Sequence, residues 1–216
     1  MTALSSTTAD PDPIRPPSRI AGRRVGSTRQ DGDVTLRYDL GTTPIGLVTA
    51  VFSDTGLLAL HVADDTDRWV LEMLAQEHGV VPDHQPGSGA ALFTQLDEYF
   101  AGSREAFDVE IDWGLTQGFA RDALQEIRRI PYGETAAYGE IAERAGRPRA
   151  HRAVGTACRT TPFSIVVPVH RVIRSDGSLG EYGGRPENKR FLIDLENGVS
   201  PSLSIPPRRS PNGDDF

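Results

Sequence analysis

The sequence predicts an α/β protein of two domains, an N-terminal antiparallel sheet with helices followed by a mostly helical domain that contains a helix-turn-helix. Three observations support this fold class. Short apolar segments separated by turn residues fill residues 34–62. From Phe119 onward, apolar residues recur at helical spacing. Both ends are rich in Pro, Ser, Thr and Arg, so we expect disordered tails over 1–33 and 200–216 around domains spanning 34–112 and 113–199.

The N-terminal domain begins with three predicted strands, in "VTLRYDL", "GLVTAVF" and "GLLALHV", which fit an antiparallel meander. Two helices are expected next, over about 67–79 and 89–101. The second places Leu92, Leu96, Tyr99 and Phe100 on one side and ends at a glycine. The stretch "AFDVEIDW" is expected to add a strand. No reactive groups cluster in this half, which we interpret as structural.

The C-terminal domain begins with a predicted helix that runs from Phe119 and stops at Pro131. Two short helices follow, "AYGEIAERAG", closed by Gly146, and "PRAHRAVGTACR". Two short helices joined by a glycine-containing turn are typical of a helix-turn-helix, although many helical hairpins bind nothing. The last helix divides into an apolar face (Ala150, Ala153, Val154, Ala157, Cys158) and a basic face (Arg152, Gly155, Thr156, Arg159).

Charge is unevenly distributed along the chain. The 216 residues carry 23 basic and 30 acidic side chains, a net charge of −7 that argues against a general nucleic-acid binder. The segment between Phe119 and Arg174, however, contains ten arginines and five acidic residues. The rest of the chain therefore has a net charge of −12. This basic segment predicts one polyanion-binding face, and a solvated surface is the alternative.

The single cysteine, Cys158, excludes an internal disulfide and a thiolate-rich zinc site. Its place on the apolar face favours a core cysteine over a nucleophile. We find no metal-ligand set among His61, His78 and His84 and expect neither metal nor cofactor. No membrane-length apolar stretch and no signal peptide occur, so we expect a cytoplasmic protein. We also expect it to be a monomer.

Four linked motifs carry a family resemblance: "IPYGETAAYGEIAERAG", "RAVGTACRTTP", "IVVPVHRVIRSDGSLGEYGG" and "KRFLIDLE". In order and spacing they resemble the O6-alkylguanine-DNA alkyltransferases, also called methylated-DNA–protein-cysteine methyltransferases, over residues 119–197. The resemblance implies a ribonuclease-H-like N-terminal domain and a winged-helix-like C-terminal domain. In this family a cysteine in a Pro-Cys-His-Arg motif takes the alkyl group from guanine O6. A histidine, oriented by a glutamate, activates this cysteine by drawing its thiol proton through a water molecule.

The resemblance also implies roles for individual residues. His170 and Glu196 match the family's histidine and glutamate. Arg152 matches the arginine finger that fills the space left by the flipped base. Tyr138 matches the tyrosine that pushes the 3′ phosphate during flipping. Further positions that touch the DNA backbone fall on Gly139, Arg147 and Ser175. The alkyl-base pocket is expected to comprise Val169, Val172, Tyr182 and Gly183.

Two positions depart from the family pattern. The nucleophilic cysteine is Val169, which cannot accept an alkyl group, and the asparagine that braces the active-site turn is Thr161. This form resembles the alkyltransferase-like members, which lack the cysteine, although many of these lack the N-terminal domain. They bind and flip O6-alkylguanine without removing the alkyl group and pass it to nucleotide excision repair.

Three interpretations follow from the sequence. The first is a non-catalytic sensor of O6-alkylguanine in double-stranded DNA, in which Val169 supplies an apolar wall for the alkyl group. The second is a working methyltransferase with Cys158 as the acceptor, and the third is a degenerate family member without specific DNA binding. Without the nucleophile, His170 and Glu196 are expected to be structural remnants of the triad.

Overall fold

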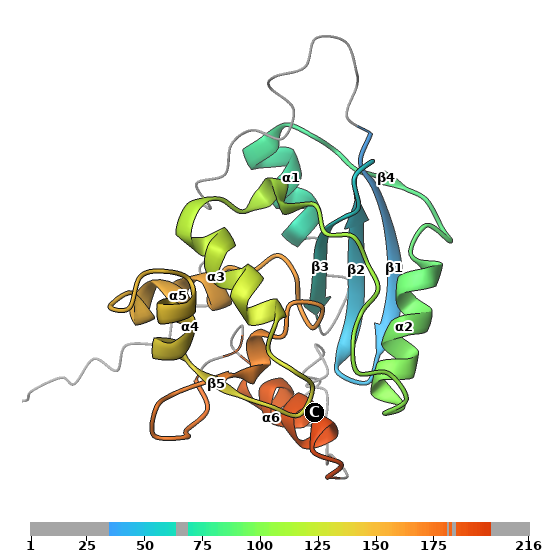
Figure 1. Ribbon diagram of the computed structural model, residues 1–216. Helices are drawn as coiled ribbons and strands as arrows, with labels where there is room; N and C mark the ends of the chain where they lie inside the picture. The colour runs from blue at the N-terminus through green and yellow to red at the C-terminus, as the bar shows by residue number, and fades with distance from the viewer. Residues whose placement is uncertain (1–34, 64–68, 181, 183–184, 200–216) are drawn as a thin grey trace, which may run out of the picture.

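The computed structural model describes residues 35–63, 69–180, 182 and 185–199. Both predicted tails, 1–33 and 200–216, lie outside these residues. Figure 1 shows a sheet with two flanking helices on one side of the molecule, and the remaining helices gathered beside it. The predicted α/β class with a sheet-containing N-terminal part and a helical C-terminal part is confirmed. The domain boundaries themselves stay a prediction.

The sheet is mixed and not purely antiparallel. Strands β1 (Arg37–Thr43), β2 (Gly46–Phe52) and β3 (Leu57–Ala63) form the expected antiparallel meander. A fourth strand, β4 (Asp83–His84), pairs in parallel with β1, so the strand order is β3-β2-β1-β4. Two residues are too few to show a period in the sequence, which explains why β4 was not predicted.

Helices cover both faces of this sheet. Helix α1 (Trp69–His78) packs on one face and α2 (Ala90–Phe100) on the other, close to the ranges predicted for them. The α1 face is built by Val51, Leu58, Ala59, Val70, Met73 and Leu74, and the α2 face by Val48, Ala50, Leu57, Leu92, Leu96 and Tyr99. Burial on both sides explains why β2 and β3 are nearly continuous apolar runs.

The strand expected in "AFDVEIDW" does not form. Only a single bridge joins Ile111 to Leu57, and the short 3-10 helix η1 (Trp113–Leu115) follows. The same outer edge of β3 also contacts the C-terminal half, because Leu60 bridges to Phe163. Two segments therefore each meet this edge at one point, and neither extends into a ladder.

The C-terminal half contains the three predicted helices, α3 (Gly118–Arg128), α4 (Tyr138–Arg144) and α5 (His151–Arg159). Helices α4 and α5 pack on each other and both contact α3, and Gly146 in the turn between them has a φ of +75°. A two-stranded parallel pair, β5 (Ala136–Ala137) with β6 (Val172–Ile173), and helix α6 (Pro186–Glu196) complete this half.

The apolar face of α5 is narrower than the sequence predicts. Val154 and Ala157 are buried, but Ala153 is exposed, and Ala150 and Cys158 are half-buried. The helix lies at the surface, so only the residues facing α3 and α4 are covered. Arg152, Thr156 and Arg159 on the opposite face are exposed as expected, whereas Gly155 is half-buried.

The two halves are joined at β3. The Leu60 amide donates to the Pro162 carbonyl at 2.7 Å, and the Ser164 amide donates to the Leu60 carbonyl at 2.9 Å. One hydrophobic cluster runs from β2 and α2 through Phe163 to α3, α5 and α6. The N-terminal sheet therefore fixes the segment that leads directly into the Pro-Val-His-Arg motif.

Candidate functional site

The segment from Ser164 to Arg171 bends tightly twice. The Val166 amide donates to the Ser164 carbonyl at 2.7 Å, which closes a three-residue γ-turn around Ile165, whose φ is +66°. A second turn of this size, around Pro168, is closed by the Val169 amide donating to the Val167 carbonyl at 2.8 Å. A positive φ at a β-branched residue is strained, and such strain is concentrated at functional sites. The turns lead into the 3-10 helix η2 (Val169–Arg171).

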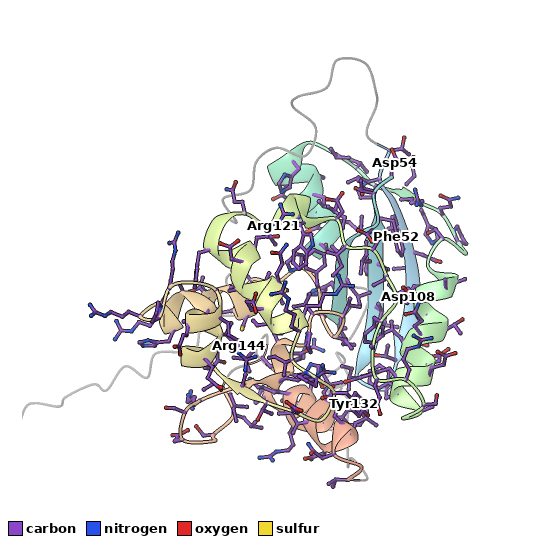
Figure 2. The ribbon with its side chains drawn as sticks, in the orientation of Figure 1. Phe52, Asp54, Asp108, Arg121, Tyr132 and Arg144 are labelled. Carbon is purple, nitrogen blue, oxygen red and sulfur yellow. The ribbon has the colours of Figure 1, made fainter. Side chains whose placement is uncertain are left out.

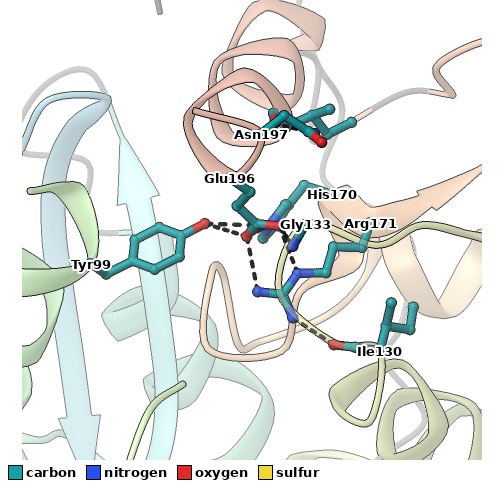
Figure 3. Close-up of polar contacts among 8 residues, drawn as sticks. Tyr99, Ile130, Gly133, His170, Arg171, Glu196 and Asn197 are labelled. Carbon is teal, nitrogen blue, oxygen red and sulfur yellow. Dashed lines mark hydrogen bonds and ion pairs between the residues drawn. The ribbon is translucent and has the colours of Figure 1, made fainter. Parts of the chain in front are cut away.

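A buried polar cluster surrounds the carboxylate of Glu196, the last residue of α6 (Figure 3). Its Oε1 atom accepts hydrogen bonds from the Tyr99 hydroxyl at 2.6 Å, from His170 Nε2 at 2.7 Å and from Arg171 Nη2 at 2.9 Å. Its Oε2 atom accepts from Arg171 Nε at 2.9 Å and from the Gly133 amide at 3.3 Å. The sequence prediction that His170 lies beside Glu196 agrees with this geometry.

Charge and burial fix the protonation states in this cluster. Burial raises the pKa of Glu196, but the hydrogen bonds from His170 and Arg171 and the positive charge of Arg171 outweigh burial and bring the pKa to about 2. Burial lowers the pKa of His170, which is fully inaccessible, more than Glu196 raises it. Burial, reinforced by Glu196, raises the pKa of Tyr99. At neutral pH the cluster therefore contains a carboxylate, a guanidinium, a neutral imidazole and a neutral phenol.

This arrangement orients a base but offers it no nucleophile. A carboxylate that accepts from Nε2 of a neutral imidazole leaves Nδ1 unprotonated, as a base that activates a thiol requires. Position 169, next to this base in η2, holds a valine that is 4% exposed. The cluster could take a proton, and the adjacent side chain has none to give.

A second buried group, Lys189 of α6, was not predicted. Its side chain is fully buried, and Nζ donates to the Val172 carbonyl at 2.6 Å and lies 5.9 Å from the centroid of the Tyr138 ring. Burial lowers the pKa of Lys189. The Tyr138 ring also lies against Gly180, where an added Cβ would overlap the hydroxyl oxygen of Tyr138. Tyr138 is thus held between a glycine and a buried cation, half-buried at the start of α4.

Cys158 does not lie in a setting that makes a thiol reactive. The residue keeps some accessible surface, but its thiol is packed within the protein, and burial raises its pKa to about 12 even though nearby Lys189 lowers it. At neutral pH almost no thiolate is present, and the thiolate is the nucleophilic form. The prediction of an unreactive cysteine agrees with this environment.

The residues predicted to touch DNA lie at the surface of the helix-turn-helix and of the turn after β6. Gly139, Arg147, Arg152 and Ser175 are exposed. The Arg147 guanidinium lies 5.2 Å from the centroid of the Phe119 ring, which orients it on α3. Exposed arginines gather on and between α4 and α5, and one of them, Arg144 at the end of α4, is labelled in Figure 2. The full set is Arg144, Arg147, Arg149, Arg152 and Arg159.

Of the predicted pocket residues, Val169 and Val172 are buried, and Gly183 lies outside the described residues. Tyr182 is half-buried with a buried hydroxyl, and its ring lies edge-on to His170 with 6.4 Å between the centroids. Thr161, where the resemblance leads us to expect asparagine, makes a local contact: its Oγ1 accepts from the Phe163 amide at 3.2 Å, just before the two tight turns.

Sequence reasoning missed Tyr99 and Arg171. The N-terminal half was interpreted as purely structural, yet α2 contributes Tyr99 directly to the carboxylate. A signal was present: a tyrosine on the apolar stripe of a helix buries its hydroxyl and needs a partner. Arg171 was assigned no role, although it makes two hydrogen bonds to Glu196 and one to the Ile130 carbonyl at 2.6 Å.

The part of the chain that the structure describes contains neither a metal-ligand cluster nor a membrane-spanning helix. No group of three or more His, Cys, Asp or Glu side chains there could hold a metal ion. His84 stacks on Tyr38, and His78 is buried at the end of α1, so these histidines do not converge. No described helix is long and apolar enough to cross a membrane.

Both halves of the chain match known protein families. Residues 36–113 match the ribonuclease-like domain of 6-O-methylguanine DNA methyltransferase, and residues 118–198 match its DNA-binding domain. The chain is similar to methylated-DNA–protein-cysteine methyltransferases of Mycolicibacterium paratuberculosis (39% identity) and Mycobacterium tuberculosis (43% identity), each over 77% of this chain and 96% of the relative. A solved structure of Mycobacterium tuberculosis OGT in complex with DNA is 37% identical, covers 77% of this chain and 96% of that chain, and has a TM-score of 0.65.

Proposed function

The chain belongs to the 6-O-methylguanine DNA methyltransferase family, and we propose that it is a non-catalytic sensor of alkylated DNA. It binds duplex DNA containing O6-alkylguanine, flips the base and holds it without removing the alkyl group. The bound lesion is then flagged for nucleotide excision repair. The observation that carries this proposal is Val169, an inert side chain beside an otherwise assembled His170–Glu196 pair.

DNA binding is supported by charge and by relatives. Five exposed arginines lie on and between α4 and α5, in a chain whose net charge is −7. Such a local excess binds phosphates without reading sequence. A relative of 37% identity has been solved in complex with DNA. We propose Arg147, Gly139 and Ser175 as backbone contacts on this face.

Base flipping is assigned to Arg152 and Tyr138. Arg152 is the second residue of α5 and is exposed, so it can enter the duplex and occupy the space of the extruded base. Tyr138 is held against Gly180 and Lys189 at the start of α4 and so presents a fixed surface to the backbone. Extrusion costs a few kcal/mol of stacking and pairing, which binding in the pocket must offset.

The pocket is assigned to Val169, Val172, Tyr182 and Gly183. Val169 and Val172 give an apolar wall, on which each buried CH₂ contributes about 0.8 kcal/mol. This preference for an alkylated base survives loss of the thiol. Nothing favours the alternative acceptor, because burial raises the pKa of Cys158 to about 12.

The test is an anisotropy titration of the full chain with two fluorescent duplexes that differ only in O6-methylguanine or guanine at one position. A sensor binds the methylated duplex more tightly than the unmodified one. Nucleoside analysis of the DNA recovered from the purified complex then finds O6-methylguanine unchanged. Equal affinities would remove the case for a sensor and leave a degenerate family member.

A further inference from the structure

The hydrogen-bonding state of His170 follows from the groups around Glu196. Five hydrogen bonds converge on this carboxylate: one from Tyr99, two from Arg171, one from the Gly133 amide and one from His170. The guanidinium and the amide have no acceptor capacity on their nitrogens, and an ionised carboxylate only accepts. His170 therefore carries its ring proton on Nε2, which donates to Oε1 at 2.7 Å.

The other ring nitrogen is left as a bare acceptor. His170 Nδ1 is buried and has no hydrogen-bond partner among the described residues, and the residue is 0% exposed. Buried polar atoms are nearly always satisfied, so one without a partner needs an explanation. Nδ1 also lies on the ring edge turned away from the Glu196 cluster, because the Nε2 edge faces the carboxylate.

None of the described residues donates a hydrogen bond to Nδ1, and the Tyr182 hydroxyl, which is also buried, has no partner among them either. Val169 precedes His170 in η2, and the edge-on Tyr182 ring is 6.4 Å away between centroids. The two nearby cations are engaged elsewhere: Lys189 donates to the Val172 carbonyl, and Arg171 donates to Glu196 and to the Ile130 carbonyl. Val169 and Tyr182 belong to the alkyl-base pocket that we proposed, so the unsatisfied acceptor lies on a residue that adjoins this pocket.

We propose that His170 Nδ1 is a specificity determinant, which favours O6 adducts that carry a hydrogen-bond donor on the alkyl group. This inference rests on the proposed function. O6-(2-hydroxyethyl)guanine presents a hydroxyl that donates to Nδ1, whereas O6-propylguanine has the same size and leaves Nδ1 unpaired. O6-carboxymethylguanine places an acceptor-only anion against the same lone pair and is the disfavoured adduct. His170 is thus reassigned from an expected remnant of catalysis to a reader of the adduct.

The experiment titrates the full chain with four fluorescent duplexes of identical sequence that contain guanine or one of these three adducts. The hydroxyethyl duplex binds about five- to tenfold more tightly than the propyl duplex, the ratio expected for one neutral hydrogen bond. The carboxymethyl duplex binds more weakly than both. In His170→Leu the hydroxyethyl-to-propyl ratio falls to about one.

Two failures are distinguishable. If hydroxyethyl and propyl duplexes bind equally but both exceed guanine, the sensor stands and the role of Nδ1 is refuted, as it would be if a retained water satisfied Nδ1 in every complex. If no adduct exceeds guanine, the proposed function itself fails. Should His170→Leu not fold, nitrogen-15 NMR of the unmodified protein decides: the Nδ1 resonance moves on binding hydroxyethyl and not propyl duplex, and a proton already on Nδ1 overturns the proposal.

Discussion

Replacing Tyr99 by Phe removes one oxygen from the centre of the polar cluster. Tyr99 is fully buried in α2, and its hydroxyl donates to Glu196 Oε1 at 2.6 Å across the junction of the two halves. A hydrogen bond to a charged group contributes about 1.5–3 kcal/mol. Oε1 keeps two other donors, His170 and Arg171, so we expect the lower part of this range, about 1.5–2 kcal/mol. The ring itself stays packed, so no cavity term is added.

The assay is urea unfolding followed by fluorescence, with Tyr38→Phe as the matched control. Tyr38 is half-buried on β1 and stacks on His84 in the same half, and its replacement is expected to cost less than about 0.5 kcal/mol. Tyr99→Phe should lower the midpoint at an unchanged denaturant slope and lower the Tm by roughly 3–8 °C. A loss no larger than that of Tyr38→Phe would refute the reasoning that α2 stabilises the carboxylate.

Three further predictions concern DNA binding and pH. Arg152→Ala should bring the affinities for methylated and unmodified duplexes together, and an equal loss on both would contradict the finger assignment. Arg147→Ala should weaken both duplexes alike and reduce the slope of log K against log salt by about 1. The free energy of unfolding should fall as pH drops below about 6.5, by up to ~1.4 kcal/mol per pH unit, because the lowered pKa of buried His170 leaves the unfolded chain binding the extra proton. Urea midpoints at pH 7.5 and 5.5 measure this, and a flat profile would contradict it.

Local patterns predicted most of the fold, and long-range pairing was the part they missed. Three strands and the helices over 69–78, 90–100, 118–128, 138–144 and 151–159 each carry their own period or turn chemistry. The two-residue strands β4, β5 and β6 exist only because distant segments meet, and so no local period marks them. The strand expected in "AFDVEIDW" has the right composition but finds only one bridge, at Leu57.

The site residues that lie in the linked sequence motifs were predicted, and the residues whose role depends on being buried together were missed. The His170–Glu196 contact followed from the family pattern. The roles of Tyr99, Arg171 and Lys189 depend on which side chains are buried in the same place in the fold. No single segment of the sequence predicts this. The assignments of Arg152, Arg147 and Tyr138 to DNA stay predictions.

The most direct test of the central claim measures transfer and binding in the same tubes. The full chain is incubated with duplex DNA carrying radiolabelled O6-methylguanine, beside Val169→Cys, which places a thiol next to the oriented His170. The account predicts lesion-selective binding with no label on the native chain, and label on Val169→Cys. Label on the native chain would contradict it, and loss of that label in Cys158→Ser would identify Cys158 as the acceptor.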